Sequence, residues 1–325
     1  MTRTPRVHPK NARVIAGVFF LCAILQGCAL VVPQTADLRG NWPAGLPERA
    51  ELTEVPFFPQ DEYQCGPAAL ATALAHVHVP VTPEDLVSQV YIPARKGSVQ
   101  VEMLAAPRRY GLVSYALAPS YADVLREVAA GTPVVTLQDY GLGPLKLWHY
   151  AVVVGYDREK GELVLRSGEK RRLTMPLEVF EYTWKDSGRW AMVAVPPARV
   201  PATADRAQYL NAIVALEKVR QPRAAAQAYT AYLERWPDEL GAGIGLANAH
   251  YALGELDRAE VVLRQTLARH PDSIVVMNNL AQTLSDAGRI DEALEVIERA
   301  AARDGPHAAV VSETRAQILQ RIQRR

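Results

Sequence analysis

The spacing of apolar positions changes character along residues 52–196. The first part shows helical spacing with many alanines, and Thr82-Pro83 has the N-cap and first-turn residues of a helix start. Helices are predicted over residues 65–75, from Thr82 onward, and over 98–109 and 120–130. Valine-rich runs bounded by turn residues predict strands over 133–138, 149–156, 162–167, 170–174 and 190–195. Helices followed by strands favour an α+β domain over alternating βαβ units.

After residue 205 the small and large apolar positions repeat every 34 residues. The repeated positions are Ala225, Ala259 and Ala293; Tyr229, Leu263 and Ile297; and Pro237, Pro271 and Gly305-Pro306. This pattern resembles the tetratricopeptide repeat, in which the small residue lets two helices approach and the proline ends the second helix. The resemblance implies an all-α solenoid of about three repeats over residues 206–306, a polar capping helix over 307–325 and a protein partner.

Two proline-rich segments mark the expected domain boundaries. Residues 28–51 are rich in proline, glycine and charge, and are predicted to be a tether. Residues 197–205 form a short polar run with prolines between two different sequence textures, and are predicted to be a linker. The folded domains are therefore expected at 52–196 and 206–306.

The N-terminus has the pattern of an export signal. Positive residues precede the apolar run 14–25, which is shorter than the ~20 residues that a membrane-spanning helix needs. The run ends in Leu25-Gln26-Gly27-Cys28, which resembles a bacterial lipobox. The resemblance implies a signal peptide over residues 1–27, cleavage before Cys28 and lipidation of Cys28. Ala29 stands where an inner-membrane retention signal would usually show aspartate, so the same resemblance implies the outer membrane, with the body facing the periplasm. The alternative is an ordinary secretory signal with a chance cysteine.

Processing at this site leaves one free thiol. Cys22 leaves with the signal peptide and Cys28 is blocked by lipid, so Cys65 is alone in an oxidising compartment where structural cysteines usually come in pairs. Such a thiol is either reactive or a small buried apolar group. The formal net charge of +1 and the lack of a basic run argue against nucleic-acid binding. No cysteine or histidine spacing suggests zinc, and no cofactor is expected.

Two segments carry candidate chemistry. In the first, Cys65 begins a predicted helix, where free backbone N–H groups and the helix dipole favour a thiolate. In the second, His149 opens an apolar strand and can accept the thiol proton, forming an imidazolium–thiolate pair. Gln60, five residues before Cys65, can join the Cys65 backbone N–H in an oxyanion hole. Gly66 is expected to leave room for a substrate backbone beside the sulfur.

Together these segments resemble the bacteriocin-processing cysteine peptidases, family 39 among cysteine peptidases, within the papain-like clan. That family cuts leader peptides after a double glycine with a cysteine nucleophile, a histidine base, an oxyanion glutamine and an aspartate that orients the histidine. The resemblance implies these roles for Cys65, His149 and Gln60. The aspartate is absent, because Ser167 stands in its place. Folding the hairpin after the histidine strand brings Ser167 beside His149, where its oxygen can accept from the imidazole; Glu169 is the alternative orienter.

The sequence therefore favours a membrane-anchored cysteine peptidase that cleaves a peptide or an exported protein, with the repeats holding a substrate or partner. A peptidase-like adaptor that binds a peptide without cutting it is the main alternative, and the missing aspartate favours it. Another acyl-transfer reaction on the same cysteine and histidine is a third possibility. Double-glycine cleavage is not assumed, because no transporter is fused to the domain.

Overall fold

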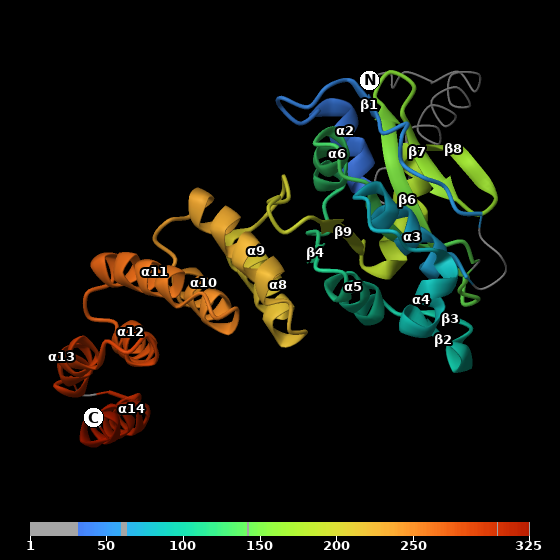
Figure 1. Cartoon of the computed structure of the whole chain (residues 1–325). Helices are drawn as coiled ribbons and strands as arrows, with labels where there is room; N and C mark the ends of the chain where they lie inside the picture. The colour runs from blue at the N-terminus through green and yellow to red at the C-terminus, as the bar shows by residue number, and fades with distance from the viewer. Residues whose placement is uncertain (1–31, 60–63, 142, 304, 325) are drawn as a thin grey trace, which may run out of the picture.

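The computed structural model describes residues 32–59, 64–141, 143–303 and 305–324. It has an α+β body followed by an arm of consecutive helices (Figure 1). The helices of the body are α2 (Pro33–Gly40), α3 (Cys65–His76), α4 (Pro83–Val90), α5 (Gln100–Arg109), α6 (Tyr121–Ala129) and α7 (Leu177–Trp184), with 3-10 turns η1 (Pro93–Arg95) and η2 (Lys185–Ser187). Within these described residues no helix is long and apolar enough to cross a membrane.

The body is built on one antiparallel sheet. Its strands are β1 (Arg49–Glu51), β4 (Val113–Ala116), β5 (Val134–Asp139), β6 (Trp148–Asp157), β7 (Glu162–Ser167), β8 (Lys170–Pro176) and β9 (Ala191–Val195). They run in the order β4-β9-β5-β6-β7-β8, with β1 paired to β6, and a separate hairpin joins β2 (Tyr91–Ile92) to β3 (Gly97–Ser98). The predicted α+β class, helices and strands are confirmed, whereas β1, β4, α7 and the small hairpin were not predicted.

The two faces of the sheet carry different layers. Along β6, Val152 and Val154 pack against α3, while Ala151 and Val153 belong to the cluster that includes α6 and α7. The alanines of α3 let its backbone lie close to the sheet, and all of residues 66–74 are buried. Burial of each large apolar side chain such as Leu70 contributes about 2 kcal/mol to the free energy of folding. This packing holds the helix that begins at Cys65 against the sheet.

The predicted tether is wrong over most of its length. Residues 33–40 form α2, with Pro33 in the first turn where its missing N–H costs nothing. The backbone amide of Thr35 donates to the buried carboxylate of Glu181 on α7. Strand β1 pairs with β6, and a Cβ on Gly155 would lie 2.8 Å from the carbonyl oxygen of Ala50. The segment from Pro33 onward is therefore part of the body.

The arm consists of α8 (Arg206–Lys218), α9 (Pro222–Arg235), α10 (Leu240–Ala252), α11 (Leu256–Arg269), α12 (Ile274–Asp286), α13 (Ile290–Ala301) and α14 (Ala308–Gln323). The 34-residue periodicity is explained by packing, since Ala225, Ala259 and Ala293 are all completely buried. Positive φ angles at Gly254 and Gly288 allow the turns between paired helices. The predicted all-α solenoid is confirmed, and α14 lies where the capping helix was expected.

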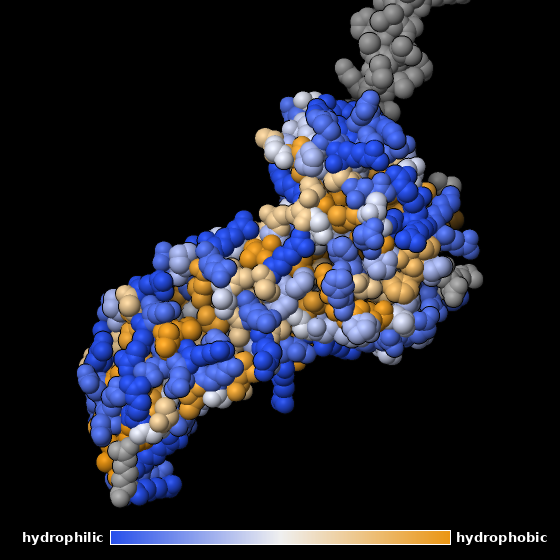
Figure 2. Space-filling view, turned by 45° about the horizontal axis from the view of Figure 1, so that its top comes forward, coloured by the Kyte–Doolittle hydropathy of each residue, from blue (hydrophilic) through white to orange (hydrophobic). Residues whose placement is uncertain are grey.

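The first repeat helix packs on the body. The hydroxyl of Tyr115 on β4 accepts a bond from the backbone amide of Asp205, and the side-chain amide of Gln208 on α8 donates to the carbonyl of Ala116. Tyr209 and Leu216 are buried in the same apolar cluster as the sheet and α6. In the space-filling view the body and the arm form one continuous surface (Figure 2). The segment predicted as a linker is thus held at a packed junction.

Candidate active site

Cys65 is the first residue of α3, as predicted, and is half-buried. Burial raises the pKa of its thiol, against the effect of the backbone amides of Tyr150, Gly66 and Cys65 itself, which hydrogen-bond the sulfur and lower the pKa. Two amides of the helix start, as the sequence suggested, and one amide of β6 thus contact the sulfur, but the effect of burial on the pKa is larger.

The glycine beside the thiol has a different role from the one expected. A Cβ on Gly66 would lie 2.2 Å from the hydroxyl oxygen of Ser98 and 2.6 Å from its Cβ. The space beside Gly66 is therefore filled by the side chain of Ser98 on β3, and not reserved for a substrate backbone. The small residue allows β3 to pack against the start of α3.

His149 lies near the start of β6, opposite Gln138 on β5. Its Nε2 is 2.9 Å from the hydroxyl oxygen of Ser167, so the β6–β7 hairpin brings these two side chains together as the sequence argument required. Tyr140 stacks on the imidazole with ring centroids 5.0 Å apart. Burial lowers the pKa of His149 to about 4, which leaves the imidazole neutral at pH 7.

These two shifts change the expected resting state. Burial favours the neutral form of both Cys65 and His149, so the imidazolium–thiolate pair predicted from the sequence is disfavoured before a substrate binds. A nearby carboxylate would offset this effect. Asp139 instead forms an ion pair with Lys146 at 2.8 Å and accepts bonds from the amides of Gly141 and Leu147. It holds the loop before β6 in place.

Cys65 and His149 line one open pocket of about 830 Å³. The hairpin residues 95–98 form one side and contribute Arg95 and Lys96. Leu147 and Trp148 form part of the rim, and their side chains are 61% and 45% exposed. Tyr150 also lines the pocket, but its side chain is almost completely buried in the core. The pocket can therefore accept a chain with apolar side chains, and cationic groups flank it.

The remaining sequence candidates differ in what the structure describes. Gln60 and Cys28 lie outside the described residues, so their proposed roles stay predictions. Glu169, the alternative orienter, is exposed, whereas Ser167 is buried against His149. Sequence reasoning missed Tyr140 and its neighbour Gln138. The signal for them was a polar Gln-Asp-Tyr ending on an otherwise apolar strand.

Comparison with known families decides the domain assignment. Residues 52–192 match the model of the peptidase C39-like family, and residues 216–276 and 256–318 match the tetratricopeptide repeat. The chain combines a C39-like peptidase domain with tetratricopeptide repeats. None of the curated proteins matches the chain.

Several solved structures resemble a part of the chain. One is a C39-like peptidase from Bacillus anthracis, at 19% identity and a TM-score of 0.39, covering 46% of this chain and 98% of the other. A second is a double glycine motif protease from an AMS/PCAT transporter in complex with the leader peptide, at 23% identity, TM-score 0.35, and coverages of 44% and 91%. A third is the peptidase domain of Streptococcus ComA, a bifunctional ABC transporter of a quorum-sensing pathway, at 20% identity, TM-score 0.36, and coverages of 44% and 99%.

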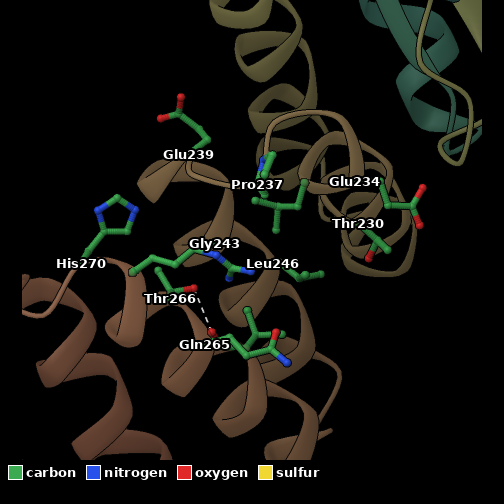
Figure 3. Close-up of a pocket in the computed structure, with 12 residues that line it drawn as sticks. Thr230, Glu234, Pro237, Glu239, Gly243, Leu246, Gln265, Thr266 and His270 are labelled. Atoms are coloured by element: carbon green, nitrogen blue, oxygen red, sulfur yellow. Dashed lines mark hydrogen bonds between the residues drawn. The ribbon is translucent and has the colours of Figure 1, made fainter.

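The repeats contain a second, smaller pocket of about 250 Å³ between α9, α10 and α11 (Figure 3). Its lining mixes apolar side chains such as Leu246 with the charged or polar side chains of Glu234, Glu239 and His270. Gly243 must be small here, because a Cβ would lie 2.4 Å from the hydroxyl oxygen of Thr266. This hollow lies on the repeats and carries none of the catalytic candidates.

Proposed function

We propose that the protein is a cysteine peptidase of the cell envelope that cleaves a peptide or an exported protein, with Cys65 as nucleophile. The observation that carries the proposal is the common pocket of Cys65 and His149, in which Ser167 engages Nε2 of the imidazole. That contact leaves Nδ1 as the nitrogen available to the thiol. The match of residues 52–192 to the peptidase C39-like family supports the same reaction class.

The chemistry follows from these positions. Nδ1 of His149 takes the thiol proton as the sulfur of Cys65 attacks the peptide carbonyl, and then gives it to the leaving amine. A thioester remains on Cys65, and a water deprotonated by His149 hydrolyses it. The oxyanion of each tetrahedral intermediate would accept bonds from the Gln60 side-chain amide and the Cys65 backbone amide.

The lipid anchor on Cys28 is part of this proposal. Since α2 begins at Pro33, only four residues (29–32) separate the anchored cysteine from this helix. The five Cα–Cα steps from Cys28 to Pro33 span at most about 18 Å, so an anchored body would work close to the outer-membrane surface. The repeats would then present a substrate or a protein partner from the periplasmic side.

A second candidate is a peptide-binding adaptor that does not cut. Two observations favour it: a serine occupies the position of the orienting carboxylate, and burial keeps both Cys65 and His149 neutral at rest. The intact thiol and imidazole in one pocket favour the peptidase over this candidate.

Incubation of the mature chain with a library of peptides, with new termini mapped by mass spectrometry, tests the proposal. Cleavages are expected with the native chain and are lost in both Cys65→Ala and His149→Gln. Identical cleavages in Cys65→Ala would overturn the assignment of the nucleophile. Retention of intact library peptides by the native chain, without any cleavage, would favour the adaptor.

A further inference from the structure

A continuous series of hydrogen bonds begins at Nε2 of His149. Nε2 of His149 contacts the hydroxyl of Ser167 at 2.9 Å, and the same hydroxyl bonds the phenol of Tyr140. The Tyr140 hydroxyl donates to Oε1 of Gln138 at 3.2 Å, and Nε2 of Gln138 donates to the hydroxyl of Thr183 on α7 at 2.7 Å. Three strands and a helix therefore supply one connected chain.

Thr183, at the far end of this series, determines which group donates and which accepts in each of its hydrogen bonds. The hydroxyl of Thr183 donates to the backbone carbonyls of Val179 and Phe180 at 3.1 and 3.0 Å. A carbonyl oxygen can only accept, so Thr183 spends its proton there and must accept from the amide of Gln138. The carbonyl of that amide is then the acceptor for Tyr140.

The same reasoning carries the direction back to the imidazole. Because Tyr140 donates to Gln138, its oxygen accepts from Ser167, and the Ser167 oxygen in turn accepts from His149. Nε2 must then carry the proton, and Nδ1 keeps its lone pair. A hydroxyl alone can rotate either to accept from Nε2–H or to donate to a lone pair on Nε2, so Ser167 by itself selects neither tautomer.

Burial makes the direction costly to reverse. The side chain of Gln138 is completely buried, and an unpaired amide group there would lose the full value of its hydrogen bonds. The stacked ring of Tyr140 also holds the plane of the imidazole. None of the groups in this hydrogen-bonded series is a carboxylate. Asp139, which follows Gln138 on the opposite side of β5, instead forms an ion pair with Lys146.

We propose that Tyr140, Gln138 and Thr183 are positioning residues which, through Ser167, hold His149 in the tautomer with the proton on Nε2 and the lone pair on Nδ1. These neutral groups, whose hydrogen bonds all point the same way, orient the histidine as a single carboxylate does in a site with an aspartate. The inference rests on the proposed use of His149 as the base, but it concerns the tautomer itself and is measured without a substrate.

Nitrogen NMR of the mature chain labelled at histidine with ¹⁵N tests the proposal, with the His149 signals assigned by their loss in His149→Gln. At pH 7 the Nε2-protonated tautomer is expected to dominate in the native chain, with a minor Nδ1-protonated form as the reference for the variants. Thr183→Val keeps the shape of the side chain but frees the amide of Gln138 to turn and reverse the chain. The ratio of the Nδ1-protonated to the Nε2-protonated form should rise about fivefold, the weight of one net hydrogen bond.

Two further variants make the result specific. Thr183→Ser retains the hydroxyl and should restore the native tautomer, and Tyr140→Phe, which keeps the stacked ring, should behave like Thr183→Val. A native chain with the proton on Nδ1, or unchanged tautomers in both Thr183→Val and Tyr140→Phe, would overturn the inference. A native chain with the proton on Nε2 that cleaves no peptide would support the role of the positioning residues and refute the proposed peptidase activity.

Discussion

At the scale of single residues, no carboxylate in the described part of the chain hydrogen-bonds His149, the proposed base of the site. Burial lowers the pKa of His149 and raises that of Cys65, and Ser167 cannot offset either shift as a carboxylate would. Proton transfer is therefore expected to accompany attack on a bound substrate, since an ion pair is not stabilised in advance. This makes position 167 a control point for reactivity.

Replacement of Ser167 by Asp tests this view. A carboxylate at hydrogen-bond distance from Nε2 should raise the pKa of His149 by about 1–3 units and stabilise the imidazolium–thiolate pair. Alkylation of Cys65 by iodoacetamide at pH 7 is then expected to speed up by about tenfold or more, the effect of one pKa unit. Ser167→Asn is the matched uncharged control. Equal rates for the two variants would contradict an electrostatic role for this position.

Site residues could be predicted from the sequence where they belong to a local motif or to the two strands of one hairpin. Cys65 and His149 have distinctive neighbours, and the strand-like alternation gave the register that brings Ser167 back to His149. The polar side chains of Gln138 and Tyr140 at the end of an apolar strand are visible in the sequence, but their role could not be predicted, because it depends on which strand lies beside β6. Strand pairing across a sheet leaves no local periodicity in the sequence.

At the scale of elements, the position of α3 decides where the thiol lies. Gly66 is the point at which β3 approaches this helix, and Ser98 fills the space that a larger residue would need. Most elements were predictable from periodicity and caps, as at Thr82, where a capping box is present. The segment containing α2 and β1 was mistaken for a tether because its proline and glycine content hid tertiary contacts with α7 and β6.

Gly66→Ala should displace the start of α3 or the β2–β3 hairpin. Overpacking of this kind costs about 1–3 kcal/mol, so the free energy of unfolding in urea should fall by that amount, and alkylation of Cys65 should change with it. Ser98→Gly removes both atoms that the new methyl group would meet and should restore much of the loss in the double variant. A double variant no more stable than Gly66→Ala would show that the contact with Ser98 is not the cause.

At the scale of the whole molecule, the body and the first repeat share a core. Tyr209 and Leu216 on α8 are buried with residues of the sheet, whereas Leu280 on α12 lies in a separate apolar cluster. Residues 197–205 were predicted to be a linker from their proline content. That content does not reveal which surfaces pack together, so the junction could not be predicted. The repeats therefore leave the body in a fixed direction through a packed junction (Figure 1).

Hydrogen exchange can separate the two clusters. Tyr209→Ala removes a fully buried aromatic ring, at a cost of about 3–5 kcal/mol, and should speed amide exchange in β4 on the body. Leu280→Ala is the control in the distal cluster and should speed exchange in α12 and α13 but not in β4. Unchanged protection of β4 in Tyr209→Ala would contradict a shared core.

The central claim is that His149 activates Cys65, and the pH dependence of Cys65 alkylation tests it most directly. The neutral imidazole can take the thiol proton as the sulfur attacks iodoacetamide, which requires a pH above its own pKa of about 4. Its help ends where the thiol ionises unaided, at a pKa raised by burial. The native chain should therefore react faster with iodoacetamide than His149→Gln between about pH 5 and pH 8, and the two rates should converge at high pH. Superimposable profiles for the two proteins across this range would contradict the account.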